Sequence, residues 1–425
     1  MARHDDRSEF KRDSDRLMFS APFRRLQNKT QVFPLPGSIF VHNRLTHSLE
    51  VSCVGMSLGN DVARQLTERH PSLRGTLFED IGTIVSAACL AHDMGNPPFG
   101  HSGERAIRAF FTEGAGQYLN SKVSDTFWSD ITHFEGNANA FRLLAHRFKG
   151  RRDGGFVLTY STLASIVKYP HSSFMAGKKG KFGFFHSEQD IYLKIANDLG
   201  IRQMERNEKG IRFARHPLVY LVEAADDICY EIMDIEDSFK LKILSLEETK
   251  DLLLSYFTEE RRAKLEKMLK MVSDENEQIA YLRSNVIGLL TNECTQTFLN
   301  NEEKILNGEF EGSLISHISE QPANAYKHCC KVAYERIYKS RDVVDIEVAG
   351  FRIIGTLIEL MTDAVLSPDK AYSQLLINRV SSQYNMKSPE LFDRIQAVLD
   401  YVSGMTDVFA LDLYRKLNGN SLPAV

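Results

Sequence analysis

The residues with most chemical capability lie between positions 91 and 104, which read AHDMGNPPFGHSGE. His92 and Asp93 place an imidazole next to a carboxylate, which is a hard oxygen ligand, and His101 and Glu104 follow a few residues later. A run with almost no polar side chains, residues 81–90 (IGTIVSAACL), comes directly before them. We therefore expect a buried helix that ends at a chemical site.

Two further residues can complete a metal site around His92-Asp93. His47 lies in NRLTHSLE on an earlier helical segment, and Asp226 lies in YLVEAADDICYEIMDIED on a later one. Two histidines with two aspartates suit a divalent cation, with Mn²⁺ or Mg²⁺ preferred and Fe²⁺, Co²⁺, Ni²⁺ or Zn²⁺ compatible. The opposite interpretation is that the dipeptide is structural, since an HD pair taken alone is more often structural than ligating.

The spacing of the remaining polar residues strengthens the case for a site. His101 and Glu104 are three residues apart, so on a helix they share one face, where the carboxylate can orient and charge the imidazole. Such a pair can serve as a general base or acid. Asp226, Tyr230 and Asp234 follow at four-residue intervals, which confines them to a stripe about 80° wide on a helix. We interpret this stripe as a pocket wall; the alternative, a charged solvent face, is disfavoured by flanking Leu221, Val222, Ile228 and Ile232.

Helical periodicity dominates the elements that must position these residues. Strand-like alternation is scarce, and residues 177–185 (GKKGKFGFF) are the clearest non-helical segment, expected to be a loop or hairpin. The sequence therefore predicts an all-α fold, one large unit with a C-terminal helical extension. The segments with one apolar face are residues 43–66, 218–235, 247–271, 348–365 and 391–417.

Composition restricts the class of protein to which the chain can belong. The 425 residues are 43% hydrophobic and 25% charged, which is typical of a soluble globular protein. No apolar run approaches the roughly 20 residues that span a bilayer, and the N-terminus MARHDDRSEFKRD lacks the apolar core of a secretory signal, so we expect a cytoplasmic protein. The six cysteines form no CxxC pair and are expected to be reduced thiols. A net charge of −4 argues against a nucleic-acid coat protein.

Together these motifs carry a family resemblance. The order His47, His92-Asp93, Asp226 is the H…HD…D pattern of HD-domain phosphohydrolases, and the surrounding sequence resembles the deoxyguanosine triphosphate triphosphohydrolase (dGTPase) family. The matching stretches run from residue 19 to about residue 415, which is nearly the whole chain. They are FSAPFRRLQNKTQVFPL, NRLTHSLEV, AHDMGNPPFGHSGE, HFEGNANAFRLL, VKYP, YLVEAADDICYEIMDIED and DYVSGMTDVFALDLY.

The resemblance implies an HD-domain helical bundle with a catalytic region over residues 1–240 and a helical C-terminal region over residues 241–425 that packs on it and contributes to assembly. It implies a catalytic pair, His101 with Glu104. It implies four metal ligands, which are His47, His92, Asp93 and Asp226. It also implies nucleotide contacts from Arg24, Arg25, Gln31, Asn137, Lys168, Tyr169, Tyr230 and Asp234.

The activity implied by the resemblance is metal-dependent hydrolysis of dGTP, or more broadly of dNTPs, to deoxynucleoside and inorganic triphosphate, which controls the dNTP pool. Members of the family commonly form hexamers, and some respond to dNTPs or single-stranded DNA. The loop at residues 171–188 (HSSFMAGKKGKFGFFHSE) suits an effector or nucleic-acid contact, because its lysines and phenylalanines alternate. The other interpretation is a solvated hairpin with a hydrophobic foot.

Two rival functions stay open at this point. One is an HD hydrolase that acts on a nucleoside monophosphate or a cyclic nucleotide, which would lack the FRRLQNKTQVF and GNPPFGHSGE context. The other is an effector-regulated nucleic-acid-binding protein with a vestigial site. Every metal and catalytic position holds a competent residue, and this favours a working enzyme.

Overall fold

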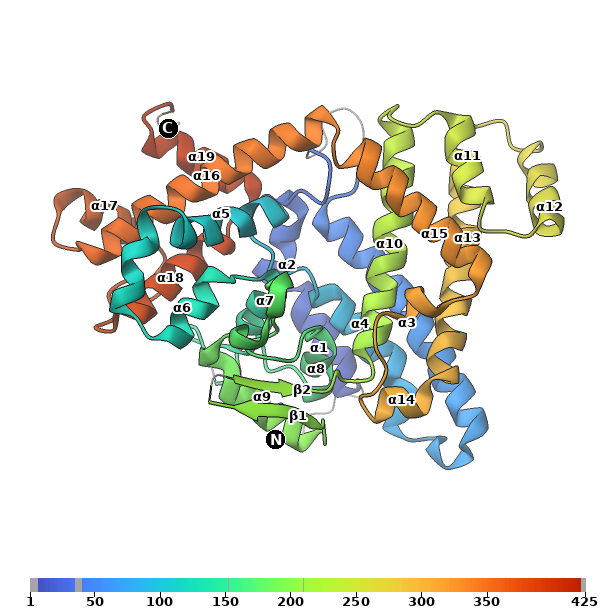
Figure 1. Ribbon diagram of the computed structural model, residues 1–425, viewed down its shortest axis with the longest axis horizontal. Helices are drawn as coiled ribbons and strands as arrows, with labels where there is room; N and C mark the ends of the chain where they lie inside the picture. The colour runs from blue at the N-terminus through green and yellow to red at the C-terminus, as the bar shows by residue number, and fades with distance from the viewer. Residues whose placement is uncertain (1–6, 35–39, 152, 209, 422–425) are drawn as a thin grey trace. The chain divides into compact units, whose positions relative to one another are not determined.

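The computed structural model describes residues 7–34, 40–151, 153–208 and 210–421, and most of them are helical (Figure 1). Residues 1–6 of the charged N-terminus and Leu35, the last residue of the first family motif, lie outside the described residues. The described strands, β1 (Gln203–Asn207) and β2 (Gly210–Phe213), form one antiparallel pair. The all-α class expected from the sequence is therefore confirmed.

Nineteen α-helices account for the described helical structure, apart from short 3-10 turns and the π-helical segment η9 (Ala333–Ile337). They are α1 (Glu9–Met18), α2 (Ala21–Arg25), α3 (Arg44–Arg69), α4 (Ile81–Ala91), α5 (Gly100–Thr112), α6 (Asp125–Thr132), α7 (Gly136–Ala145), α8 (Tyr160–Ile166), α9 (Gln189–Asp198), α10 (Val219–Lys240), α11 (Leu246–Leu254), α12 (Glu259–Leu269), α13 (Glu275–Asn300), α14 (Glu302–Leu306), α15 (Glu320–Val332), α16 (Arg341–Leu366), α17 (Ala371–Arg379), α18 (Leu391–Ser403) and α19 (Asp407–Leu417).

Two of the long predicted helices are each broken into two. The segment 247–271 divides into α11 and α12, and the segment 391–417 divides into α18 and α19. The second break follows from local chemistry, because Gly404 ends α18 and the hydroxyl of Thr406 accepts the amide N–H of Phe409 (3.1 Å) to start α19. The predicted helices at α3, α4, α10 and α16 are confirmed.

The chain divides into two compact units, each built from segments that are distant in sequence. Unit 1 comprises the described parts of Met1–Ser14, Val32–Leu90 and His216–Val344. Unit 2 comprises Asp15–Gln31, Ala91–Arg215 and Asp345–Val425 within the described residues.

In unit 1, α3, α10 and α13 pack against one another and lie side by side in Figure 1. α4 approaches α3 closely because α3 has glycine at the contact: a Cβ at Gly59 would lie only 2.6 Å from the Cα of Gly82. The hydroxyls of Ser52 and Ser86 share a hydrogen bond (2.7 Å) in the same interface. Later residues of α3 thus contact earlier residues of α4, so the helices are antiparallel and α4 ends near the N-terminal end of α3.

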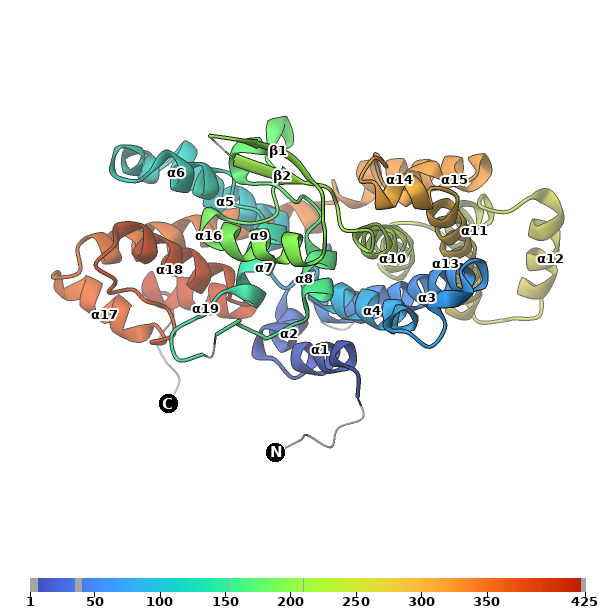
Figure 2. The same ribbon diagram turned by 90° about the horizontal axis from the view of Figure 1, so that it is seen from below.

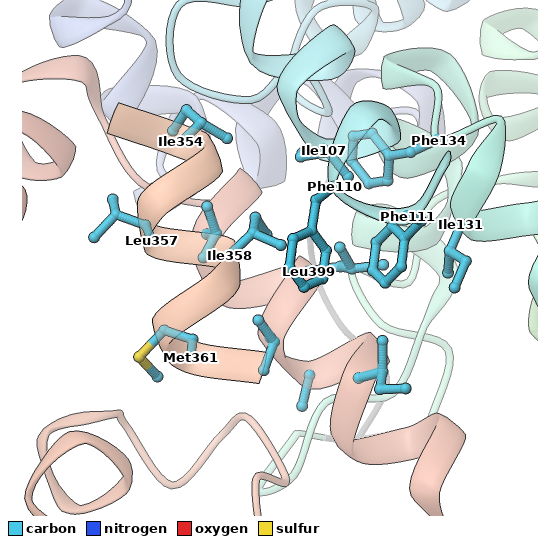
Figure 3. Close-up of a cluster of buried hydrophobic side chains, with 14 of the residues drawn as sticks. Ile107, Phe110, Phe111, Ile131, Phe134, Ile354, Leu357, Ile358, Met361 and Leu399 are labelled. Atoms are coloured by element: carbon cyan, nitrogen blue, oxygen red, sulfur yellow. The ribbon is translucent and has the colours of Figure 1, made fainter. Parts of the chain in front are cut away.

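In unit 2, the hydrophobic core joins α5 to the C-terminal helices. Figure 3 shows Ile107, Phe110 and Phe111 of α5 with Ile354 and Leu357 of α16, and all five are buried. Burial of each large apolar side chain stabilises the fold by roughly 1.5–3 kcal/mol. The core therefore holds α5 firmly along its length, while its first residues remain available for chemistry.

The small sheet belongs to unit 2 and lies beside α9 in both Figure 1 and Figure 2. Tyr192 of α9 packs against Phe213 of β2, with ring centroids 5.5 Å apart. Among the described helices, none combines the length and the apolar character that a membrane crossing requires. All six cysteines are free thiols, as the sequence predicts.

Candidate functional site

The N-terminus of α3 fixes His47. Asn43 and Thr46 form a capping box, in which Asn43 Oδ1 accepts the Thr46 N–H (3.0 Å) and Thr46 Oγ1 accepts the Asn43 N–H (3.1 Å). His47 follows immediately in the first turn and is 2% exposed. Its Nε2 lies 3.0 Å from Oδ1 of Asp226 on α10, so unit 1 brings two of the four predicted metal ligands into direct contact.

The predicted stripe on α10 is half-buried at Asp226 and Tyr230 and buried at Asp234. The Tyr230 ring packs edge-on against the His47 ring, with centroids 6.3 Å apart. Asp234 is 4% exposed, and its Oδ2 accepts the hydroxyl of Tyr338 (2.7 Å). Burial raises the pKa of the Asp234 carboxyl well above its usual range, and the nearby acids Glu231 and Asp237 raise it further. This environment favours the neutral acid over the carboxylate at Asp234.

His92 and Asp93 belong to unit 2 and directly follow α4. His92 Nε2 lies 3.7 Å from Asp93 Oδ1, and Asn96 Nδ2 donates to the same carboxylate oxygen (2.5 Å). The predicted metal ligands are thus divided in membership, two in each unit. In each pair an imidazole accompanies a carboxylate.

His101 and Glu104 lie on α5 as predicted. His101 is 73% exposed, whereas Glu104 is 3% exposed, and His101 Nδ1 lies 3.2 Å from Glu104 Oε2. Phe99, immediately before the helix, has a left-handed backbone (φ 60°), and Gly100 does too (φ 54°). This tight turn lets an exposed imidazole sit over a buried carboxylate at the start of a helix.

The Glu104 carboxylate is held by donors on all sides. Oε1 accepts the N–H of Gly136 (2.8 Å), and Oε2 accepts from Arg108 (3.1 Å) on the next turn of α5. Although burial opposes ionisation, His101, Lys181 and Arg108 lower the pKa of Glu104 to about 2. Glu104 is therefore a carboxylate throughout the neutral range and keeps a full negative charge beside the imidazole.

Asn137 lies at the start of α7, next to this cluster. Glu135, fully buried, accepts the backbone N–H of Asn137 at Oε2 (2.7 Å) and its side-chain amide at Oε1 (2.9 Å). Lys181 Nζ donates to the same Oε1 (2.5 Å) and lies 3.9 Å from Glu104 Oε2. Two positive and two negative side chains thus alternate in one buried group.

The C-terminal motif DYVSGMTD braces the loop before α5. Asp407 accepts the backbone N–H of Phe99 (2.9 Å) and that of Thr30 (2.7 Å). Asp400, from the same motif, makes a two-pronged ion pair with Arg142 of α7 (both contacts 2.8 Å). This motif therefore fixes the backbone on which His101 and Asn137 are mounted.

The other predicted nucleotide contacts lie in unit 2. Arg24 is exposed and Arg25 is half-buried at the end of α2, and burial lowers the pKa of Arg25. Among the described residues, Oε1 of Gln31 is buried without a hydrogen-bond partner. Lys168 and Tyr169 are half-buried, and the ammonium of Lys168 lies 5.8 Å from the centroid of the Tyr169 ring.

The loop at residues 171–188 holds most of its phenylalanine rings inside unit 2. Phe182, Phe184 and Phe185 are at most 1% exposed, so these rings belong to the core and cannot stack on bases. Lys181 joins the Glu104 group, while only Lys178 and Lys179 point their charge to the exposed surface. The alternation of lysine and phenylalanine reflects anchoring of the loop in unit 2.

Sequence reasoning missed several members of these groups. Glu135 could have been found, because it stands in the HFEGN motif two residues before Asn137. Tyr338 and Lys181 carry no comparable local signal, and each meets its partner only through the fold. Tyr338 directly follows the π-helical segment η9, a rare geometry that often accompanies functional positions.

Comparison with known proteins agrees with this arrangement. A model of the HD domain matches residues 44–211, and a model of the phosphohydrolase-associated domain matches residues 317–416. The deoxyguanosinetriphosphate triphosphohydrolase-like protein of Pseudomonas aeruginosa (strain LESB58) is 37% identical over 427 residues, which covers 98% of this chain and 95% of that protein.

Two further relatives come from other bacteria. The deoxyguanosinetriphosphate triphosphohydrolase-like protein of Synechocystis sp. is 38% identical over 430 residues, with coverage of 98% of this chain and 95% of the relative. The deoxyguanosinetriphosphate triphosphohydrolase of Yersinia enterocolitica is 30% identical over 490 residues, with coverage of 96% and 93%. The chain therefore belongs to the deoxyguanosinetriphosphate triphosphohydrolase family of HD-domain hydrolases.

Proposed function

We propose that the protein is a metal-dependent dNTP triphosphohydrolase that converts dGTP, and more broadly dNTPs, into deoxynucleoside and inorganic triphosphate and so controls the dNTP pool. The relatives' names support this substrate. The observation that carries the proposal is the exposed His101 imidazole bonded to the buried, ionised Glu104. An imidazole held this way can take up or release a proton at the attacked phosphate ester.

We assign the divalent metal to His47, His92, Asp93 and Asp226. The donor chemistry fits, since His47 contacts Asp226 within unit 1 and His92 lies beside Asp93 within unit 2, so each unit supplies an imidazole and a carboxylate. Support also comes from α4, which ends near the N-terminal end of α3 and is followed directly by His92. A bound divalent ion polarises phosphoryl oxygen and lowers the pKa of bound water. Mn²⁺ and Mg²⁺ are the preferred ions.

The chain's own residues would bind and orient the nucleotide. Lys168, Arg24 and Arg25 neutralise charge on the polyphosphate. Tyr230 packs against the sugar and leaves no room for a 2′-hydroxyl, and Asp234, one turn further along α10, contacts the nucleotide. Asn137 and Tyr169 complete the wall, and the proton at His101 moves at the 5′ oxygen while Glu104 holds the imidazole in place.

The metal assignment is tested by Asp93→Ala. We expect the variant to lose both bound metal, measured by elemental analysis after gel filtration, and hydrolysis, while its far-UV circular dichroism stays unchanged. Asp61→Ala is the matched control, because Asp61 is an exposed acid on α3 that pairs with Arg64. Full activity of Asp93→Ala under metal-depleted conditions would remove the metal from the mechanism.

The bond that is cut is tested by resolving the products by chromatography, with dGTP, the other dNTPs and GTP assayed in Mg²⁺ and in Mn²⁺. We expect deoxyguanosine and triphosphate from dGTP, and little turnover of GTP. Release of dGMP with pyrophosphate as the first products would instead favour a different HD hydrolase.

Preference for guanine would come from Gln31. Its buried Oε1 has no partner among the described residues and can accept from N1 or N2 of guanine. Discrimination of roughly 1–3 kcal/mol follows when a buried polar group loses its partner. We expect Gln31→Ala to lower the ratio of kcat/KM for dGTP over dATP. An unchanged ratio would mean that Gln31 only braces the segment of Arg24 and Arg25.

Assembly, regulation and location complete the proposal. We expect a homo-oligomer, a hexamer by analogy with the family, with dNTPs or single-stranded DNA as effectors, in the cytoplasm. Light scattering at micromolar concentration tests assembly, and a fully active monomer would contradict it.

A further inference from the structure

An ion pair between the half-buried Lys181 and the fully buried Glu135 adjoins the His101–Glu104 pair in unit 2. We propose that Lys181 and Glu135 form a positioning pair that sets how tightly His101 holds its proton and fixes the amide of Asn137 at the same time. The inference rests on the proposed acid–base role of His101. Lys181 and Glu135 act through His101 and Asn137 and do not contact the substrate themselves.

The contacts form one continuous chain from His101 to Asn137. His101 Nδ1 lies 3.2 Å from Glu104 Oε2, and Lys181 Nζ lies 3.9 Å from the same oxygen. Lys181 also donates to Glu135 Oε1 (2.5 Å), which in turn accepts the Asn137 amide (2.9 Å). Because Glu135 is fully buried, its charge has no solvent to screen it and depends on Lys181.

The charges around Glu104 balance. Glu104 and Glu135 contribute two negative charges, and Arg108 and Lys181 contribute two positive charges. Arg108 is fixed separately, since its Nε donates to the Phe134 carbonyl (2.8 Å). Three further titratable groups belong to the neighbouring elements. Arg105 of α5 forms an ion pair with Glu347 of α16 (3.1 Å). The phenol of Tyr169 contributes to raising the pKa of Lys181. Removal of one member of the Lys181–Glu135 pair therefore leaves an uncompensated charge near His101.

The sign of that charge decides the effect on the imidazole. Without Lys181, two carboxylates face one guanidinium, and the surplus negative charge favours the protonated imidazole. Without the Glu135 carboxylate, Lys181 adds surplus positive charge and favours the neutral imidazole. The two variants should therefore change His101 in opposite directions, which general structural damage would not do.

The test measures His101 directly. The rate at which diethyl pyrocarbonate modifies His101, followed by peptide mass spectrometry at pH 7, reports the neutral fraction of this exposed ring. We expect Lys181→Met to slow the modification about three- to tenfold, Lys181→Arg to restore it, and Glu135→Gln to accelerate it. The pH profile of kcat should move to higher pH in Lys181→Met and to lower pH in Glu135→Gln.

Lys179→Met is the matched control, because it removes the same charge from the exposed part of the same loop and should leave the modification rate unchanged. Glu135→Gln should also raise KM through Asn137. Shifts of the same sign in Lys181→Met and Glu135→Gln, or an equal shift in Lys179→Met, would overturn the proposal. The modification needs no substrate, so absence of dNTP hydrolysis would be a separate failure.

Discussion

Glu104 in unit 2 and Asp234 in unit 1 are two buried carboxyl groups whose pKa values shift in opposite directions. Their exposed fractions are nearly equal, 3% and 4%. Burial opposes ionisation at both, yet His101, Lys181 and Arg108 lower the pKa of Glu104 to about 2. At Asp234 burial raises the pKa, and neighbouring acids raise it further against the hydrogen bond from Tyr338.

The difference shows that, at nearly equal burial, the neighbouring groups decide in which direction the pKa of a carboxyl group moves in this protein. Glu104 faces cations and a backbone N–H, which stabilise a carboxylate. Asp234 lies beside Glu231 and Asp237, which stabilise the neutral acid, while the hydroxyl of Tyr338 donates to Asp234 and opposes this effect. The same functional group is thus held as a carboxylate in one place, while in the other its neutral form is favoured and it accepts the hydrogen bond of Tyr338.

Glu104→Gln is the largest expected effect, because it removes the charge and keeps the shape. We expect kcat to fall by roughly 10²-fold or more, the range for loss of an acid–base group. Steady-state kinetics with dGTP measure the loss, and circular dichroism controls for folding. Activity within a few-fold of the wild type would mean that the charge of Glu104 is not used.

Gly136→Ala is expected to disturb the surroundings of Glu104 by a steric clash. A Cβ at Gly136 would lie 2.0 Å from Asn96 Oδ1 and 2.8 Å from Glu104 Oε1, so the backbone donor to Glu104 must move. We expect a loss of about 1–3 kcal/mol in the free energy of unfolding, measured with urea. Gly355→Ala on α16 is the control, because nothing lies within 4 Å of its added Cβ. Equal stability of both variants would contradict the packing argument.

The contribution of His42 in unit 1 to the stability of the fold is expected to depend on pH. Burial opposes its charge, but hydrogen bonds to Asp237 (2.8 Å) and Glu50 (3.1 Å) raise the pKa of His42 to about 10. A raised pKa means that its stabilisation is complete below about pH 6.5 and is lost as the pH rises through 10. Glu104, whose pKa is lowered, behaves inversely and loses its stabilisation as the pH falls from about 4.5 towards 2.

The measurement compares urea unfolding of the wild type and His42→Gln at pH 6 and pH 10. We expect the wild-type advantage of about 1–3 kcal/mol at pH 6 to shrink at pH 10. An advantage that is constant across this range would show that the His42 charge does not stabilise unit 1.

Asp234→Asn is the smallest expected effect. An amide matches a protonated carboxyl in shape and retains both an acceptor for Tyr338 and a donor, so we expect kcat/KM for dGTP to change by only about threefold. Asp234→Ala, which removes both functions, should be clearly worse. If Asp234→Asn were as damaging as Glu104→Gln, Asp234 would have to act as a carboxylate, and the contrast between the two regions would fail.

Several features of the site could be predicted from the sequence because they depend on local geometry. The three-residue spacing of His101 and Glu104 places both on one face of α5, since a helix repeats every 3.6 residues. The same periodicity predicts the stripe of Asp226, Tyr230 and Asp234 on one face of α10. The order of the motifs, which needs no structure at all, indicates the family.

The tertiary structure alone decided which partners the buried carboxyl groups meet, and therefore how their pKa values shift. Lys181 reaches Glu135 across 46 residues, Tyr338 reaches Asp234 across 104, and Asp407 reaches Phe99 across 308. No spacing rule covers such separations, because they depend on how whole helices and loops pack. The sequence determines that residues 104 and 234 are carboxyl groups, but the direction in which each pKa moves is set by the burial and the neighbouring side chains that folding provides.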